Sequence, residues 1–299
     1  MHTSLTKTLT GLLCLTLVIV SVALAQNLKQ VEVSGARLAY VEQGTGDPVV
    51  LVHGAVADYR IWAAQMASFA PRYRVIAYSM RYHYPNAPAD ATADYTAMRH
   101  AADLAELIKV LKVAPAHIVA HSYGGTVAAY LAKDHPELIR SLVLAEPGTL
   151  ALIAQRPEAK ALGEERGAAM GRVQDAVKAG NNEDGVKNFL DYWLAPRGFA
   201  GLSASDRAAV LDNAGTLPAM FRAAPPTKPF SCEDAKNVKI PTLLVGGDAT
   251  LRTFTLVLDE LSKCLPNAEQ ATLAGTAHGV QFENATAFND VVLRFLAKY

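Results

Sequence analysis

The stretch HIVAHSYGG (residues 117–125) sets a single serine, Ser122, between an apolar run and two glycines. A buried strand, a sharp turn and a helix form the geometry of a nucleophile elbow, in which the residues two before and two after the serine must be small. Ala120 and Gly124 meet that requirement, although glycine is usual at the first position. The pattern predicts an activated serine, and a hydroxyl on an ordinary tight turn is the alternative.

The composition indicates a globular protein that binds a small ligand. The 299 residues are 51% hydrophobic and 19% charged, and 28 basic residues balance 28 acidic ones. A chain of this length buries a large core. Because no basic stripe occurs, we expect no nucleic-acid partner. The even charge balance fits a small, uncharged or weakly charged substrate.

The first 25 residues have the pattern of a secretory signal peptide. They carry one cation, Lys7, and an apolar run from Gly11 that ends in the small-x-small tripeptide 23–25. The run is shorter than the ~20 apolar residues that span a bilayer, so we expect cleavage before Gln26. An uncleaved anchor is the alternative. The expected location is periplasmic or extracellular, with no membrane anchor after cleavage.

Cleavage would leave two of the three cysteines, Cys232 and Cys264. An even pair in an exported protein is often a disulfide, but the sequence does not give the distance between them, so a bridge and two free thiols both stay open. No Cys/His spacing resembles a metal site. We therefore expect no metal and no cofactor.

Short apolar runs alternate with helical patterns along most of the chain. This alternation is typical of βαβ units around a mostly parallel sheet, and residues 29–35 and 37–44 predict an opening hairpin. Residues 150–230 show helical patterns and no strand pattern. The sequence predicts an α/β core formed by residues 26–149 and 231–299. A helical cap at 150–230 would interrupt it between the strands that end near Glu146 and Asp248, where it would cover a pocket.

A nucleophilic serine needs a base and an acid. His278 follows the last predicted strand and precedes the last helix, which favours it as the base. Glu146 ends the strand that follows the serine unit, and Asp248 follows a later strand. We favour Glu146, because a buried carboxylate there would need His278 as its partner. Asp248 is the alternative acid. Either carboxylate could instead only cap a loop, by accepting hydrogen bonds from backbone N–H groups.

Acyl transfer also needs two backbone donors for the oxyanion. The N–H of Tyr123, directly after the serine, and that of Ala55, in the loop after the strand VVLV (49–52), are the candidates. We expect the His53 side chain to support this loop. His121 and Trp193 are the candidate substrate-binding residues, and the aromatic stretch 79–86 either borders the same pocket or forms an exposed loop.

Several motifs together resemble the α/β-hydrolase superfamily over the whole mature chain. They are VLVHGA (50–55), AHSYGG (120–125), LVLAEPG (142–148), PTLLVGGDAT (241–250) and GTAHGVQFENATAFNDVVLRFL (275–296). The capped branch, which includes epoxide hydrolases, haloalkane dehalogenases and small-molecule esterases, is the most similar. The resemblance to dehalogenases implies an acid at Glu146. Their chemistry needs a carboxylate nucleophile, which Ser122 replaces.

These features predict an exported serine hydrolase that cleaves a small carboxylic ester or lactone through Ser122, His278 and Glu146. A C–C bond hydrolase or a cofactor-free, haloperoxidase-like perhydrolase would use a similar triad. A receptor-like protein with slow turnover is a further alternative. The sequence leaves the substrate's acyl and alcohol groups and the oligomeric state open.

Overall fold

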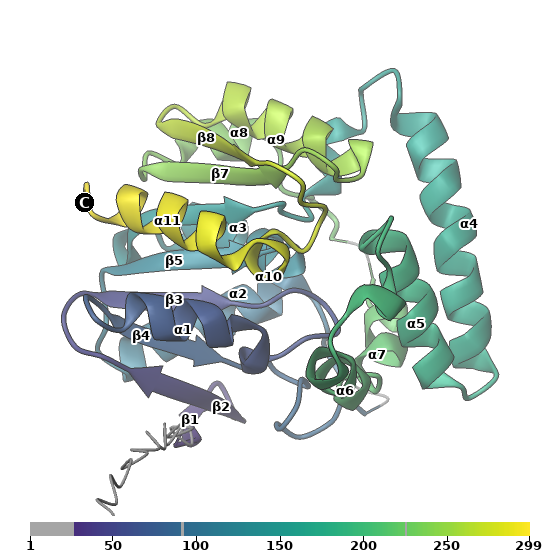
Figure 1. The fold of residues 1–299 in the computed structure, drawn as a ribbon, viewed down its shortest axis with the longest axis horizontal. Coiled ribbons are helices and arrows are strands. Elements are labelled where there is room, and N and C mark those ends of the chain that lie inside the picture. The colour runs from purple at the N-terminus through teal and green to yellow at the C-terminus, as the bar shows by residue number, and fades with distance from the viewer. Residues whose placement is uncertain (1–26, 91–92, 225) are drawn as a thin grey trace, which may run out of the picture.

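The computed structural model describes residues 27–90, 93–224 and 226–299 (Figure 1). The predicted signal peptide at 1–25 lies outside these described residues. Within them, none of the helices combines the length and the apolarity needed to traverse a bilayer.

Eight strands of the described chain form one sheet in the order β1-β2-β4-β3-β5-β6-β7-β8. The first two form the predicted hairpin, β2 runs antiparallel to β4, and the remaining pairs are parallel. The strands are β1 (Lys29–Val33), β2 (Ala36–Gln43), β3 (Pro48–Val52), β4 (Arg74–Tyr78), β5 (Ala116–His121), β6 (Ile139–Ala145), β7 (Thr242–Gly247) and β8 (Ala268–Leu273). The parallel strands β3, β5, β6 and β7 are almost entirely buried, as expected for strands covered on both faces.

Helices cover both faces of the sheet (Figure 1). One face carries α2 (Ala97–Val110), α3 (Tyr123–Asp134), α8 (Cys232–Asn237) and α9 (Arg252–Cys264). The other carries the short helix η1 (Tyr59–Trp62), α1 (Ala63–Phe69), α10 (Val280–Glu283) and α11 (Ala285–Leu296), and η2 (Pro136–Leu138) leads into β6. A disulfide joins Cys232 to Cys264, so it connects the start of α8 to the end of α9.

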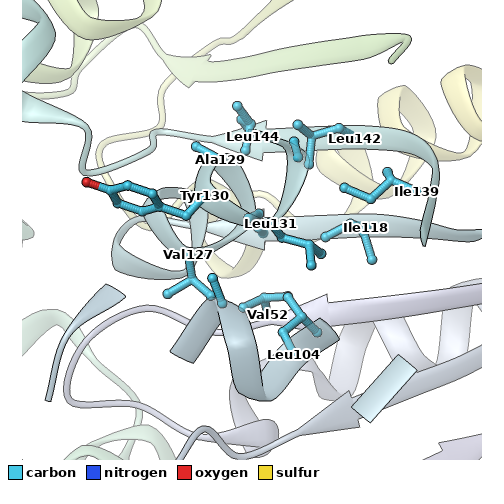
Figure 2. Close-up of a cluster of buried hydrophobic side chains, with 14 of the residues drawn as sticks. Val52, Leu104, Ile118, Val127, Ala129, Tyr130, Leu131, Ile139, Leu142 and Leu144 are labelled. Carbon is cyan, nitrogen blue, oxygen red and sulfur yellow. The ribbon is translucent and has the colours of Figure 1, made fainter. Parts of the chain in front are cut away.

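The core on the first face fixes α3 against the central strands. Figure 2 shows Val52, Ile118 and Leu142, from neighbouring strands, beside Val127 and Leu131 of α3. Leu104 of α2 closes the same cluster, and all six side chains are buried. Burial of each large aliphatic side chain contributes roughly 1.5–3 kcal/mol. This packing holds the N-terminus of α3, and hence Ser122, at the end of β5.

The chain between β6 and α8 forms helices, with no strand among its described residues. These are η3 (Leu150–Ile153), α4 (Ala159–Lys178), α5 (Asn182–Trp193), η4 (Phe199–Gly201), α6 (Ala204–Asp212) and α7 (Thr216–Arg222). We call residues 150–230 the inserted segment. It lies to one side of the layered core (Figure 1) and has its own apolar cluster, which Val56, from the loop after β3, joins.

The α/β-hydrolase fold predicted from the sequence is confirmed, but α8 and α9 are missing from that prediction. Helix α9 carries a readable signal, because Phe254, Val257 and Leu261 are buried at helical spacing. This omission matters for the site, since Phe254 packs against His278.

Candidate active site

Ser122 lies at a strained turn between β5 and α3. Its φ of 54° and ψ of −120° put a non-glycine residue in a sparsely populated region, which is common at functional sites. Its N–H donates to the Ala145 carbonyl (3.0 Å), and its carbonyl accepts from the N–H groups of Gly125 and Gly148 (both 2.9 Å). A Cβ on Gly124 would lie 2.3 Å from the His53 carbonyl oxygen, so the turn needs glycine there.

His278 stands beside Ser122, on the loop between β8 and α10. Its Nε2 is 2.8 Å from the Ser122 Oγ, and its Nδ1 is 2.7 Å from the Glu146 Oε2. Because a carboxylate only accepts, Nδ1 carries the proton and Nε2 accepts from the serine hydroxyl. The ring of Phe254 stacks on the imidazole, with centroids 3.9 Å apart. The structure therefore brings Ser122, His278 and Glu146 into one chain of hydrogen bonds.

Glu146, and not Asp248, contacts His278. Glu146 is fully buried, and its carboxylate also accepts from the Gly247 N–H (2.8 Å) and the Thr250 hydroxyl (2.7 Å). Asp248 is exposed and accepts from the Gly275 N–H (2.7 Å), which makes it a loop-capping carboxylate.

The environment of the pair keeps the histidine neutral. Burial lowers the pKa of His278 below its ordinary value, so the Nε2 lone pair is available to accept a proton. Burial raises the pKa of Glu146, while the hydrogen bonds from Gly247 and Thr250 act against this by favouring the ionised carboxylate. The two donors thus preserve the charge that would stabilise an imidazolium.

The two predicted oxyanion donors belong to residues that line a cavity together with the serine. Ala55, Ser122 and Tyr123 line the same cavity. Tyr123 is the first residue of α3, where backbone N–H groups have no acceptor within the helix. Among the described residues, no hydrogen-bond acceptor serves the N–H of Ala55 or Tyr123. Both N–H groups are therefore free to bind an oxyanion.

His53 fixes the loop that carries Ala55. Its Nδ1–H donates to the Gly54 carbonyl (2.8 Å), and its Nε2 accepts from the Met80 N–H (2.9 Å). Burial lowers the pKa of His53 to about 3, so the ring is neutral, as these two bonds require. Because the peptide unit is planar and trans, holding the Gly54 carbonyl also sets the direction of the Ala55 N–H.

A second buried network supports Tyr123, and the sequence did not indicate it. The Tyr123 hydroxyl is 2.8 Å from the His100 Nδ1, and Tyr95 stacks on the Tyr123 ring. The Tyr95 hydroxyl donates to the Nε2 of His83 (2.9 Å), whose Nδ1–H donates to the Ala57 carbonyl. These hydrogen bonds and the ring stack connect Tyr123 to the loop that follows Ala55.

Ser122 and His278 line an apolar cavity of about 270 Å³ between the core and the inserted segment. Ten of the 23 lining residues come from the inserted segment, including Phe189, Leu190, Trp193, Leu194, Val210 and Met220. Among the described lining residues there is no lysine or arginine, and Asp206 is the single carboxylate. The cavity therefore favours an uncharged substrate, because a buried charge needs a partner.

Both predicted substrate-binding residues line this cavity. Trp193 reaches it from the end of α5, with its ring 6.4 Å from that of His278. His121 lines it beside Ser122, but its Nε2–H donates to the His278 carbonyl (2.8 Å). Its ring therefore also holds the backbone of His278. No described residue of the stretch 79–86 lines the cavity, so the idea that this stretch borders the pocket is wrong.

With this geometry in view, comparison with known proteins identifies the family. The family model described as alpha/beta hydrolase fold matches residues 47–285, so the chain belongs to the α/β-hydrolase family. Membership of this family makes it a hydrolase.

Individual relatives are distant but similar in length. A putative non-heme bromoperoxidase, BpoC, of Mycobacterium tuberculosis is 28% identical over 87% of this chain and 97% of its own. The structure of an N-acyl homoserine lactone degrading enzyme is 25% identical, with a TM-score of 0.69 over 89% of this chain and 100% of its own. The meta-cleavage product hydrolase CumD, at 19% identity and a TM-score of 0.71 over 91% of this chain and 98% of its own, shares the fold.

The carboxylate that supports His278 can be tested by paired substitutions. We expect Glu146→Gln to lower kcat by roughly 100- to 10,000-fold, because an amide does not stabilise the imidazolium and favours the wrong tautomer. Asp248→Asn, the matched control, should keep near-normal turnover. Steady-state hydrolysis of p-nitrophenyl butyrate measures both. Near-normal turnover in Glu146→Gln with loss in Asp248→Asn would reverse the assignment.

The Thr250 hydroxyl offers a test by pH. Thr250→Val removes a hydrogen bond that favours the ionised form of Glu146, so the pKa of Glu146 rises further. The Glu146–His278 pair then takes up a proton at higher pH, and the acid limb of the kcat/KM profile should move to higher pH. The control is Thr255→Val on α9, since the Thr255 hydroxyl donates to no carboxylate in the described chain. Superimposable profiles for Thr250→Val and the wild type would contradict this role.

Proposed function

We propose that the protein is an exported serine hydrolase that cleaves a small, uncharged carboxylic ester or lactone. The observation that carries this proposal is the hydrogen-bond chain from the Ser122 Oγ through His278 to Glu146. The free N–H groups of Ala55 and Tyr123 beside that oxygen support acyl chemistry in particular. The N-acyl homoserine lactone degrading relative, similar over nearly the whole chain, supports an ester or lactone substrate.

Each step of the proposed mechanism uses groups already described. Ser122 attacks the carbonyl carbon while His278 Nε2 takes its proton, and the N–H groups of Ala55 and Tyr123 stabilise the oxyanion. Collapse of this intermediate releases the alcohol, which receives the proton from His278. Water, deprotonated by His278, then attacks the acyl-enzyme and releases the acid. Glu146 stabilises the imidazolium in both halves, and loss of one oxyanion donor would cost roughly 3–4 kcal/mol of transition-state stabilisation.

The cavity supports the choice of substrate class. Its lining is mainly apolar and holds no cation among the described residues, so a carboxylate-bearing substrate would lose hydration without gaining a counter-ion. The inserted segment, which supplies ten of the 23 lining residues, would act as the cap that selects the substrate.

The BpoC relative favours a second candidate, a cofactor-free perhydrolase. The acyl-enzyme would be the same, and hydrogen peroxide would replace water as the attacking group, giving a peracid and free Ser122. Production of peracid in place of the carboxylic acid distinguishes the two activities.

Export is supported by the N-terminal pattern and by the Cys232–Cys264 disulfide, since disulfides persist mainly in oxidising compartments. The mature protein would begin at Gln26 and lie in the periplasm or outside the cell. It would keep no membrane anchor.

The catalytic proposal is tested by stopped-flow hydrolysis of p-nitrophenyl acetate and butyrate. We expect a stoichiometric burst followed by steady turnover, because acylation of Ser122 releases p-nitrophenol before deacylation. Ser122→Ala should lose the burst and lower kcat by roughly 10⁴- to 10⁶-fold. A burst without turnover would point to the receptor-like alternative. Identical traces for the two proteins would overturn the mechanism.

The export proposal predicts the thiol content of the protein recovered from the host's culture or periplasm. Cleavage before Gln26 removes Cys14, and the disulfide occupies the other two cysteines. Under denaturing conditions, Ellman's reagent should therefore detect no thiol before reduction and two after it. A free thiol before reduction would contradict cleavage, the bridge, or both, and the N-terminal sequence tells these apart.

A further inference from the structure

The loop that carries His278 depends on a carboxylate that the mechanism above does not use. The loop lies between β8 and α10, where no strand or helix ladder pairs its backbone groups, and such groups need partners when buried. Glu283 supplies them. Its Oε2 accepts from the Ala277 N–H (2.8 Å), and its Oε1 accepts from the Gly279 N–H (3.2 Å). One side chain thus binds the residues on both sides of His278.

A cation of the inserted segment completes this arrangement. Arg197, in the turn between α5 and η4, lies with its Nη1 3.3 Å from the Glu283 Oε2. Its Nη2 donates to the Gly275 carbonyl (3.1 Å). The Glu283 side chain is 3% exposed and that of Arg197 is 48% exposed, so the carboxylate is buried beneath a guanidinium that faces solvent. The same guanidinium therefore contacts the loop before His278 and the carboxylate that holds it.

The pair also lines a hollow next to the cavity. A hollow of about 250 Å³ is lined by Arg197 and Glu283 and shares Leu194, Leu202, Asp206 and Phe282 with the cavity that contains Ser122. The inserted segment therefore meets the His278 loop beside the cavity, and the Arg197–Glu283 ion pair lies at that contact.

We propose that Glu283 and Arg197 are positioning residues for His278, through which the inserted segment keeps the imidazole in line with Ser122. The proposal rests on the serine-hydrolase function, because it concerns the orientation of that enzyme's base. Neither residue touches the reacting atoms. A shift of about 1 Å in a catalytic group costs up to roughly 100-fold in rate, so a loosened loop should act on kcat.

Two substitutions separate the members of the pair. Glu283→Gln keeps the shape of the side chain but places an NH₂ group against a backbone N–H, so one loop hydrogen bond and the ion pair are lost. We expect kcat to fall by about 10- to 100-fold with KM changed by less than about threefold. Arg197→Met keeps the aliphatic stem and should lower kcat by about three- to tenfold, since half of the Arg197 side chain already lies in water. In the double variant, Arg197→Met should add no further loss.

A matched control distinguishes orientation of the base from general attachment of the inserted segment. Asp212 of α6 pairs with Arg60 of η1 (2.9 Å) and is also about half exposed, but this ion pair does not contact the His278 loop. Asp212→Asn should leave kcat within about twofold of the wild type. Arg197→Lys, which retains the charge, should recover part of the activity lost in Arg197→Met.

The decisive measurements are the rate at which diisopropyl fluorophosphate labels Ser122 and the low-field proton resonance of the His278–Glu146 hydrogen bond. We expect slower labelling and a broadened or shifted resonance in Glu283→Gln and Arg197→Met, and wild-type behaviour in Asp212→Asn. If Glu283→Gln does not fold, Arg197→Met carries the test. Wild-type labelling and resonance in folded Arg197→Met, or an equal loss in Asp212→Asn, would overturn the proposal. Failure of the wild type itself to be labelled at Ser122 would instead overturn the proposed function.

Discussion

The close approach of α3 to the ends of the central strands is the constraint on which the rest of the site depends. Gly124 lies so near the carbonyl oxygens of Val52 and His53 that any Cβ there would overlap them. That contact allows the chain to turn at Ser122 with a positive φ, and Glu146, at the end of the adjacent strand, has a positive φ of 44°. The Ser122 N–H donates to the Ala145 carbonyl, and the Ser122 carbonyl accepts from the Gly148 N–H. Hydrogen bonds therefore join the two strained turns directly. Nucleophile and acid are thus positioned by one piece of backbone geometry.

Burial then shifts the pKa values of the residues held at these positions. Removal of His278 and Glu146 from water favours the neutral form of each, which suits a base that must accept a proton but would weaken an acid that must stay charged. The Gly247 N–H and the Thr250 hydroxyl offset this effect at the carboxylate alone. The neutral ring of His53 similarly directs the Ala55 peptide without placing a charge near the oxyanion. The polar groups are therefore arranged so that charge develops only when a substrate reacts.

The sequence predicted those parts of the site that depend on local spacing. Ser122 and His278 follow from the elbow pattern and from the order of strand, histidine and helix, because each pattern constrains only a few neighbouring residues. The choice between Glu146 and Asp248 depends on the direction in which each side chain leaves its strand. The sequence favoured Glu146, but it did not give the partners of Asp248, whose N–H donates to the Leu273 carbonyl and whose carboxylate accepts from the Gly275 N–H. Thr250, Arg197 and Glu283 act through contacts between segments far apart in the chain. Phe254, in contrast, could have been found from the sequence, since the helical spacing of the apolar residues in α9 predicts that helix.

Two of the polar contacts that join the inserted segment to the core differ in physical kind. On one side, Asp58 is fully buried and accepts hydrogen bonds from Arg60 and from Asn213, which follows α6. Breaking such a buried network leaves an uncompensated charge, so it fixes the segment firmly. On the other side, Arg197 pairs with the buried carboxylate of Glu283 while half of its own side chain lies in water, so solvent screens its charge. This contact therefore contributes less to the attachment of the segment than the Asp58 network does. In the positioning role proposed above, it would act on catalysis because Glu283 binds the backbone on both sides of His278.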